Sequence, residues 1–295
     1  MKMECKIFCQ AYAKINLHLA VGLPDESGYH TIESIFSKVG LYDSLEVSYS
    51  ESPFFSIEVR GLEQYCLPGM DTLTKAANLW YAKSKVPFSI LVDCKKVIPV
   101  KAGLGGGSSD AASLLAVLQQ IAGKNALDCE ELQQVARQVG SDVPFFLSGF
   151  PSALVRGKGE LVEKVKVPEK EVLLVMPTGF DISTSQAYKA LDARRESVPL
   201  VERYSLSFLL SLLQKNCYTW NHMLYNDFSP CTGHTEFYDS LNRLACEYSG
   251  FYSLTGSGAC WFFVSEQKDK LLQLQEKITL LFGSKVRMWL APLMQ

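Results

Sequence analysis

The feature that most constrains this chain is a glycine-rich loop placed directly before an apolar helix. Four glycines fall within positions 103–107, and from Ala111 to Ile121 the apolar residues recur at helical spacing. Glycine allows backbone N–H groups to turn toward a ligand, and a helix start adds unpaired N–H groups with a partial positive charge. The pattern predicts an anion site suited to nucleotide phosphates. Its residues are Gly103, Leu104, Gly105, Gly106, Gly107, Ser108 and Ser109.

Other interpretations of the loop are weaker. No Gly-Lys-Ser/Thr follows it, so it is not a Walker A loop, and it does not read as a dinucleotide-binding G-x-G-x-x-G. A plain glycine-rich connector remains an alternative. A second glycine turn, Thr255-Gly256-Ser257-Gly258, is weak alone because hairpin turns are commonly rich in glycine. Beside the first loop it becomes a candidate second wall for the phosphates.

Two charged residues are candidates for phosphoryl transfer to an alcohol, which needs a carboxylate near the hydroxyl and charge neutralisation. Asp142 follows Ser141, the expected N-cap of a short helix, and an acid that merely complements the helix dipole is the alternative. Lys14 lies on an expected strand over 11–21 whose apolar residues take odd positions, so Tyr12, Lys14, Asn16 and His18 share the other face. That face is either solvated or lines a cleft. A Lys14–Asp142 pair would keep Asp142 ionised.

Composition excludes several classes of protein. Lys+Arg 29 and Asp+Glu 31 give a net charge of −2, which argues against charge-driven disorder and against coating nucleic acid or an anionic membrane. The nine cysteines include no C-x-x-C pair and the four histidines form no close pair, so a zinc site is not expected. Scattered cysteines and an N-terminus without an apolar signal-peptide core predict a reducing, cytoplasmic location. Metal ligands and oligomeric state stay open.

Strands and helices alternate in both halves without the strict repeat of a doubly wound sheet, which predicts an α+β fold. A charged stretch over 156–171 is expected to be irregular and to join two domains. Expected strands other than 11–21 span 44–49, 54–60, 88–92, 172–175, 251–254, 261–264 and 285–290. Expected helices beyond the one after the glycine loop span 71–83, 128–139, 183–191, 206–213, 235–248 and 267–282.

Three segments together resemble the motifs of the GHMP small-molecule kinases: Ala13–Leu17, Gly103–Ala112 and Thr255–Gly258. Further motifs resemble the members that act on an alcohol carrying a cytidine diphosphate group in non-mevalonate isoprenoid precursor biosynthesis. These are Gly28-Tyr29-His30, Leu104–Gly107, Gly140–Phe146, Asn226-Asp227 and Thr255–Cys260. The motifs run from residue 11 to about 263, so the resemblance covers most of the chain.

The resemblance implies a two-domain α+β GHMP kinase fold with the active site in the cleft between domains. Residues 1–160 would form the N-terminal nucleotide-binding domain, and residues 161–295 a ferredoxin-like α+β domain. The implied reaction transfers the γ-phosphate of ATP, with Mg²⁺, to the 2-hydroxyl of the substrate. Neither a nucleic acid nor a membrane is implied as a partner.

Roles carry over residue by residue. Lys14 and Asp142 would be catalytic, with Asn16 beside them. Tyr29 would stack on the cytosine and His30 would read its edge. Tyr188 would be the second stacking aromatic with Thr184 nearby, and Lys96 would lie near the adenine. The sequence departs from the family pattern at Ser27, Thr72 and Lys101, which concerns nucleotide contacts more than the reaction.

Two other functions are compatible with parts of this pattern. One is a GHMP kinase for mevalonate or homoserine, which Gly28-Tyr29-His30 disfavours because an aromatic ring beside an edge-reading histidine suits a nucleobase. The other is a nucleotide-binding regulatory module without catalysis. Intact Lys14, Asp142 and both glycine loops disfavour it.

Overall fold

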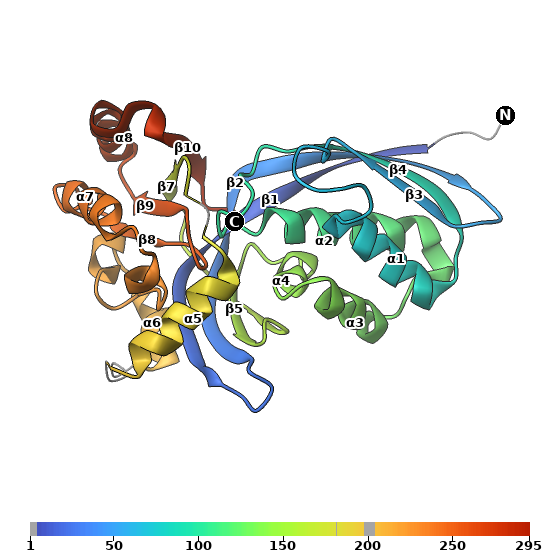
Figure 1. Ribbon diagram of the computed structural model, residues 1–295, viewed down its shortest axis with the longest axis horizontal. Helices are drawn as coiled ribbons and strands as arrows, with labels where there is room; N and C mark the ends of the chain where they lie inside the picture. Colours follow the sequence, from blue (N-terminus) through green and yellow to red (C-terminus); the bar gives the residue numbers. More distant parts are fainter. Residues whose placement is uncertain (1–4, 181, 198–203) are drawn as a thin grey trace.

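The computed structural model describes residues 5–180, 182–197 and 204–295. It contains a six-stranded and a four-stranded sheet, each with helices packed against it (Figure 1). The first sheet comprises β1 (Cys5–Pro24), β2 (His30–Glu51), β3 (Ser56–Arg60), β4 (Phe88–Lys95), β5 (Ser152–Gly157) and β6 (Leu161–Lys164). The second comprises β7 (Glu171–Pro177), β8 (Phe251–Leu254), β9 (Trp261–Ser265) and β10 (Val286–Pro292). The α+β class is therefore confirmed.

The long antiparallel pair β1–β2 is the frame of the first sheet. One end of β2 also pairs with β4 through Ser44–Glu51, and the other pairs with β5 through Ile32–Ser37. This gives the order β3-β4-β2-β5-β6 with β1 alongside β2. The expected strand over 44–49 is thus only part of a strand of 22 residues.

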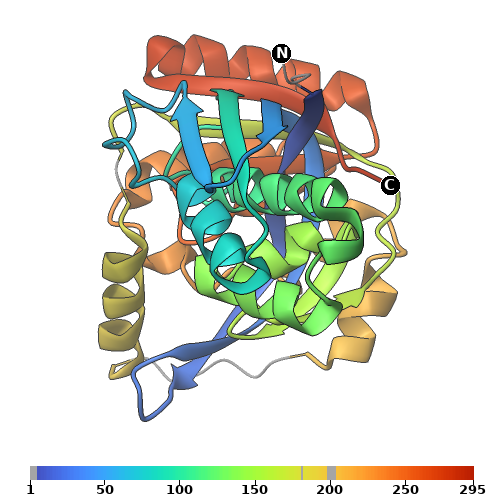
Figure 2. The same ribbon diagram turned by 90° about the vertical axis from the view of Figure 1, so that its right-hand side faces the viewer.

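Helices α1 (Thr72–Ser84), α2 (Gly106–Ala122), α3 (Cys129–Val139) and α4 (Val143–Leu147) cover one face of this sheet, as Figures 1 and 2 both show. Asp71 caps α1 by accepting from the Thr74 N–H at 2.7 Å. The expected capping box of α3 is confirmed, with Asp128 and Glu131 bonded reciprocally. Nine residues of α2 are buried, so the helix behind the glycine loop is a rigid central support.

The second sheet has the order β10-β7-β9-β8. Helices α7 (Thr235–Ala245) and α8 (Lys268–Phe282) pack against it through Leu241, Leu271, Leu274 and Ile278, all fully buried. Helices α5 (Thr184–Arg195) and α6 (Leu206–Leu212) lie at the other side of this half (Figure 1). Short 3-10 turns η1 (Gly123–Asn125), η2 (Cys217–Trp220), η3 (Ser229–Cys231) and η4 (Gly283–Lys285) complete the chain.

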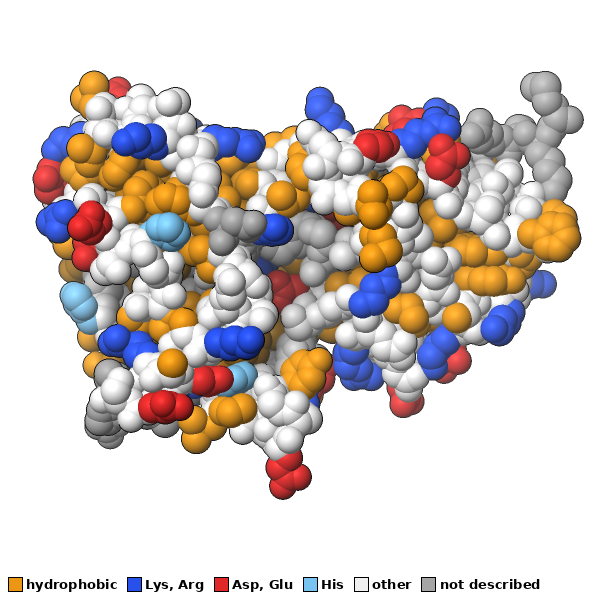
Figure 3. Space-filling model, viewed as in Figure 1, with side chains coloured by type: hydrophobic (Ala, Val, Ile, Leu, Met, Phe, Trp, Pro, Cys, Tyr) orange, Lys and Arg blue, Asp and Glu red, His pale blue; other side chains and the backbone are white. Residues whose placement is uncertain are grey.

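The apolar face predicted for β1 joins the two halves. Ala13, Ile15 and Leu17 are fully buried in one hydrophobic cluster with Val172 of β7 and Phe262 of β9. Because this face is packed, Lys14 and Asn16 lie on the opposite face of β1, where they line a cavity between the halves. Figure 3 shows the molecule hollowed at that junction.

The expectation of an irregular stretch over 156–171 is wrong in part. β5 runs to Gly157, and β6 occupies Leu161–Lys164. The charged segment of β6 pairs with Ala153–Arg156 of β5 and forms the edge strand of the sheet. Charged side chains suit an exposed edge, and their number made the segment look like a linker. The division at 160/161 stays an interpretation, and residues 1–4, 181 and 198–203 of the two expected domains lie outside the described residues.

Candidate active site

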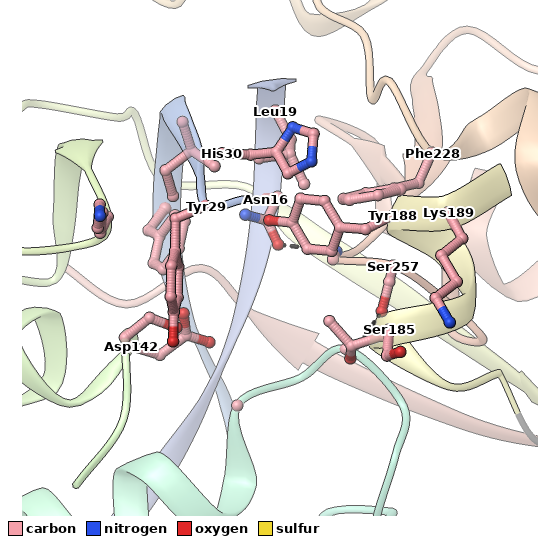
Figure 4. A pocket seen from close by; sticks show the side chains of 18 of the residues that line it. Asn16, Leu19, Tyr29, His30, Asp142, Ser185, Tyr188, Lys189, Phe228 and Ser257 are labelled. Atoms are coloured by element: carbon pink, nitrogen blue, oxygen red, sulfur yellow. Dashed lines mark hydrogen bonds between the residues drawn. The ribbon is translucent and has the colours of Figure 1, made fainter. Parts of the chain in front are cut away.

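A cavity of about 580 Å³ lies where the two halves meet. The first half contributes β1, β2, the glycine loop and the start of α4, and the second half contributes α5 and the turn around Gly256 (Figure 4). Segments more than 200 positions apart in the sequence therefore line one space. A site built in this way depends on how the two sheets pack.

Lys14 and Asp142 meet at this cavity, so the expected pair is present. Lys14 Nζ lies 3.6 Å from Asp142 Oδ2, with the lysine side chain 4% and the aspartate side chain 25% exposed. Lys14 Nζ also donates to Asn16 Oδ1 at 2.6 Å. Burial lowers the pKa of Lys14, and the charge and hydrogen bond of Asp142 oppose that lowering. The partly exposed carboxylate is thus open to a ligand while its lysine partner is enclosed.

Asp142 itself, not Ser141, is the N-cap of α4. Within the described part of the chain, its side chain makes no capping hydrogen bond. Its carboxylate lies at the cavity opposite Tyr188 (Figure 4), and its charge adds to burial in raising the pKa of the Tyr188 phenol. The geometry therefore favours a carboxylate directed at a ligand over a simple helix cap.

A β-bulge changes which residues of β1 share the polar face. Register shifts between Asn16 and His18, so His18 pairs with Ile35 while Asn16 pairs with Phe36. Lys14, Asn16 and Leu19 line the cavity, whereas the His18 ring packs edge-on against Tyr225 at 4.5 Å. The prediction that His18 shares the face of Lys14 is wrong, because the extra residue in the bulge reverses the alternation beyond it.

Asn16 connects the lysine to the second glycine turn. Its Oδ1 accepts from Lys14 Nζ at 2.6 Å and from the Gly256 N–H at 2.8 Å, and its Nδ2 donates to Ser34 Oγ at 2.9 Å. The side chain is almost fully buried. Asn16 thus fixes the lysine against the second glycine turn, and its expected contact with substrate stays a prediction.

The two glycine loops are in direct contact, as the second-wall interpretation requires. Gly103 has φ +76°, and a Cβ there would lie 2.1 Å from the Thr255 carbonyl oxygen and 3.1 Å from that of Gly258. The Thr255 Oγ1 lies 3.1 Å from the Gly103 carbonyl oxygen. No side chain fits between these backbones, so the loops form a cradle of main-chain groups. This cradle suits phosphate oxygens, with α2 beginning directly behind it.

Lys96 lies beneath the glycine loop. Its Nζ bonds Asp43 Oδ2 at 2.5 Å and Asp110 Oδ2 at 2.7 Å, and a Cβ on Gly106 would lie 3.2 Å from it. Asp43 Oδ1 also accepts from the N–H groups of Val97 and Ile98. The ammonium group is therefore held by two buried carboxylates, and a contact with adenine stays a prediction. In the folded chain Lys96 fixes the start of α2.

The Lys96 cluster gives the protein a pH-dependent stability. Burial raises the pKa of Asp110 to about 7 from 3.8, with the charge of Asp43 adding to the rise and that of Lys96 opposing it. Between about pH 4 and 7 the folded state holds a proton that the unfolded state has released, so the free energy of unfolding falls as pH rises. We expect Asp110→Asn to remove this fall, measured by urea unfolding at several pH values.

The control for this prediction is Asp93→Asn, which removes an exposed carboxylate from β4. This variant is expected to follow the wild-type pH curve. A constant difference in unfolding free energy between Asp110→Asn and wild type across this pH range would contradict the role given to Asp110.

The aromatic residues expected around a base line the same cavity. The His30 and Tyr188 rings have centroids 4.8 Å apart, and Tyr29 lies at the mouth with 63% of its surface exposed. His30 Nδ1 contacts the Gly22 carbonyl oxygen at 2.9 Å, and because a carbonyl only accepts, Nδ1 carries a proton. Thr184 Oγ1 lies 3.2 Å from Ser257 Oγ. The structure thus brings Tyr29, His30, Thr184 and Tyr188 together, and their contacts with a base stay predictions.

The three departures from the family pattern have local structural consequences. Ser27 Oγ donates to Asp25 Oδ1, which also accepts the Ser27 and Tyr29 N–H groups and so shapes the Tyr29 loop. Thr72 Oγ1 donates to the Gly107 carbonyl oxygen at 2.8 Å. Lys101 has φ 54°, a conformation that glycine adopts without strain. Two of the three departures therefore tie down loops at the site.

Sequence reasoning missed several cavity residues, chiefly Lys158, Lys189, Asp192 and Phe228. Lys158 Nζ lies 4.6 Å from the centroid of the Tyr29 ring. Asp192 Oδ2 lies 3.2 Å from His30 Nε2. Asp192 follows Tyr188 by four residues, a spacing that places both on one helix face. That signal was available, but the predicted helix ended at 191.

Neither a metal-binding cluster nor a membrane-spanning helix is found in the part of the chain that the structure describes. In residues 5–180, 182–197 and 204–295, no group of three or more His, Cys, Asp or Glu side chains is arranged to hold a metal ion. Over the same ranges, no helix has the length and apolar character needed to cross a bilayer.

Comparison with known proteins agrees with this geometry. Residues 71–150 match the model of the GHMP kinases N terminal domain. A 4-diphosphocytidyl-2-C-methyl-D-erythritol kinase of Thermotoga maritima is 35% identical over 85% of this chain and 89% of its own length. A protein of the same name from Thermoanaerobacter pseudethanolicus is 32% identical over 95% of this chain and 96% of its own.

Solved structures give the same picture. A crystal structure of 4-(cytidine 5'-diphospho)-2C-methyl-D-erythritol kinase superposes with a TM-score of 0.78 at 27% identity, covering 98% of this chain and 100% of that one. A homoserine kinase from Cytophaga hutchinsonii superposes with a TM-score of 0.71 at 15% identity, covering 100% and 96%, which shows the fold alone. The chain has the GHMP kinase fold and belongs to the family of 4-diphosphocytidyl-2-C-methyl-D-erythritol kinases.

Proposed function

We propose that this protein transfers the γ-phosphate of ATP to the 2-hydroxyl of 4-diphosphocytidyl-2-C-methyl-D-erythritol, in non-mevalonate isoprenoid precursor biosynthesis. The observation that carries the proposal is the layout of one cavity. The Lys14–Asp142 pair, the Gly103 and Gly256 backbones of the glycine cradle and the Tyr29, His30 and Tyr188 rings line this one cavity. A substrate that combines an alcohol with a nucleobase matches this set of groups.

The donor side uses the two glycine loops. The contact of Gly103 with the Thr255 backbone leaves room only for main-chain groups, which suits the close approach of a triphosphate. Ser108 and Ser109 add hydroxyl groups at the start of α2. The residues suited to Mg²⁺ bound with ATP are Ser108, Ser109 and Asp142, and the ion would neutralise charge on the phosphates.

The chemical step requires little covalent chemistry from the protein. The substrate oxygen forms a bond to the γ-phosphorus, the bond from that phosphorus to the β–γ bridging oxygen breaks, and ADP leaves. The hydroxyl proton passes to the Asp142 carboxylate, which Lys14 orients from 3.6 Å. Lys14 also neutralises negative charge that develops near the transferred group.

The acceptor side selects the base. Tyr29 and Tyr188 offer flat faces for stacking. His30 presents its ring edge, with the Nδ1 proton fixed by the Gly22 carbonyl. Homoserine and mevalonate, the alternative substrates for a kinase of this fold, have no aromatic ring to place beside these side chains. The aromatic residues therefore favour the cytidine-bearing alcohol.

The reducing environment expected from the sequence also supports a cytoplasmic setting. All nine cysteines are free thiols in the structure. With a net charge of −2, the chain offers no bulk attraction to nucleic acid. We therefore place the reaction in the cytoplasm, with small molecules as its substrates.

A coupled ADP-release assay across a panel of alcohols tests the proposal. We expect turnover with 4-diphosphocytidyl-2-C-methyl-D-erythritol and little with homoserine or mevalonate, and cytidine 5'-diphosphate should compete with the substrate. Turnover with another alcohol and no competition by cytidine diphosphate would favour a different GHMP activity. Tight ATP binding without any turnover would favour a regulatory binding module.

A further inference from the structure

Arg195, in the last turn of α5, bonds three groups outside its own helix. Its Nη1 donates to the Gly22 carbonyl oxygen at 2.9 Å, and its Nη2 donates to the Val21 carbonyl oxygen at 2.7 Å and to Asp227 Oδ2 at 2.9 Å. Asp227 Oδ2 also accepts the Val21 N–H at 2.7 Å. The Arg195 and Asp227 side chains are 10% and 19% exposed. Arginine, aspartate and the β1 backbone thus form a closed network, which we name the α5 latch.

The α5 latch shares an acceptor with the candidate base-binding histidine. The Gly22 carbonyl oxygen that receives Arg195 Nη1 also receives His30 Nδ1 at 2.9 Å. His30 Nε2 lies 3.2 Å from Asp192 Oδ2, and its ring centroid lies 4.8 Å from that of Tyr188. Tyr188, Asp192 and Arg195 are four and three residues apart, so they lie along one face of α5. The same helix face therefore carries the stacking ring and the latch.

Among the described residues, α5 buries few apolar side chains. Its buried residues are Ala187 and Leu191, which belong to a small cluster with Leu19, Val21 and Phe228. Its first turn contacts the second glycine turn through the Thr184–Ser257 hydroxyl pair at 3.2 Å. Because little apolar surface is buried here, hydrogen bonds at the end of the helix carry much of the positioning.

We propose that Arg195 and Asp227 are positioning residues that hold α5 against β1 and thereby set the spacing between Tyr188 and His30. The α5 latch acts on the acceptor end of the cavity, whereas the glycine cradle is held by Asn16, Thr255 and Asn226. The inference rests on the proposed function for the identity of the acceptor, a cytosine-bearing alcohol. It adds residues that touch neither the base nor the reacting atoms.

The chemistry of arginine explains why this residue suits the position. A planar guanidinium can donate to two neighbouring carbonyls and a carboxylate at once, whereas a lysine ammonium on its flexible stem acts as a point charge. Lysine is therefore expected to restore part of the network. Asparagine at position 227 keeps an acceptor for the Val21 N–H but removes the charge.

Steady-state kinetics of Arg195→Met test the α5 latch in the full chain. Because this variant loses the hydrogen bonds of a charged group, we expect KM for the cytidine-bearing substrate to rise by about 10-fold or more. KM for ATP should change by less than about twofold. Arg195→Lys and Asp227→Asn should give intermediate rises. Arg156→Met is the matched control, because it removes an arginine from an exposed pair with Glu163 and should leave both KM values unchanged.

If Arg195 had only a structural role, Arg195→Met would raise both KM values together or would lower only the fraction of folded protein. An unchanged KM for the cytidine-bearing substrate in Arg195→Met, or equal rises in both KM values, overturns the proposal. So does a lysine variant that is no better than methionine.

Amide hydrogen exchange separates failure of the α5 latch from failure of the proposed function. In Arg195→Met we expect faster exchange in residues 184–195 and 19–24 than in Arg156→Met, with unchanged exchange in α2. If wild type turns over no cytidine-bearing alcohol, the proposed function fails and the base-positioning role fails with it. Exchange then decides whether Arg195 holds α5, and equal rates in the two variants overturn the α5 latch.

Discussion

Replacing Asp142 with asparagine is expected to lower kcat by about 10²–10⁴-fold, the usual contribution of a positioned general base. The amide keeps the size of the side chain but cannot take the hydroxyl proton, while the cavity and its aromatic rings remain. KM for both substrates should therefore change much less than kcat. Single-turnover phosphorylation measured by rapid quench would show the loss in the chemical step itself.

Asp128→Asn is the matched control for this variant. Asp128 is also the N-cap aspartate of a helix, α3, and asparagine is an equally good N-cap residue. This variant should keep wild-type turnover, which would separate proton transfer from helix capping. Near wild-type kcat in Asp142→Asn would remove Asp142 from the catalytic role.

Replacing Lys14 with methionine is expected to lower kcat by about 10²–10³-fold, as found for loss of one group that stabilises transition-state charge. Methionine has similar length and no charge, so Asp142 loses its partner at 3.6 Å and Asn16 Oδ1 loses the donor at 2.6 Å. Because lysine and aspartate act on the same hydroxyl, the Lys14→Met and Asp142→Asn double variant should be little slower than the slower single variant.

The control for the lysine is Lys38→Met. Lys38 lies directly opposite Lys14 in the β1–β2 pair, and its ammonium lies 5.5 Å from the centroid of the Phe145 ring. Removing this second cation from the same sheet should leave kcat within a few-fold of wild type. A Lys14→Met variant that stays fully active, or a Lys38→Met variant that is equally slow, would contradict the specific role of Lys14.

Local sequence signals predicted many elements of this fold well, because their causes lie within a few residues. The capping pair Asp128–Glu131 set the start of α3, and the odd-numbered apolar residues of β1 predicted its buried face. The glycine loop before α2 predicted a backbone cradle. Each of these depends on backbone conformation or on burial of one face, which neighbouring residues control.

Errors arose where a distant segment changes a local pattern. The bulge in β1 lies between Asn16 and His18, and it turns His18 toward Tyr225 instead of the cavity. Helix α5 continues four residues beyond the predicted end at 191, because its last turn is polar. Its basic residues suit the helix C-terminus, and Arg195 bonds the β1 backbone. That extension brings Asp192 and Arg195 into the neighbourhood of the site.

The sequence by itself determined the chemical inventory of this protein: a phosphate-binding loop, a lysine on an apolar strand, an aspartate at a helix start, and aromatic residues suited to a base. Only the tertiary structure decided that Lys14 meets Asp142, that Asn16 joins Lys14 to the second glycine turn, and that Lys96 lies between two buried carboxylates. The physical reason is that each of these contacts joins segments that only the packing of strands, helices and the two halves brings together, and such packing has no spacing rule in the sequence.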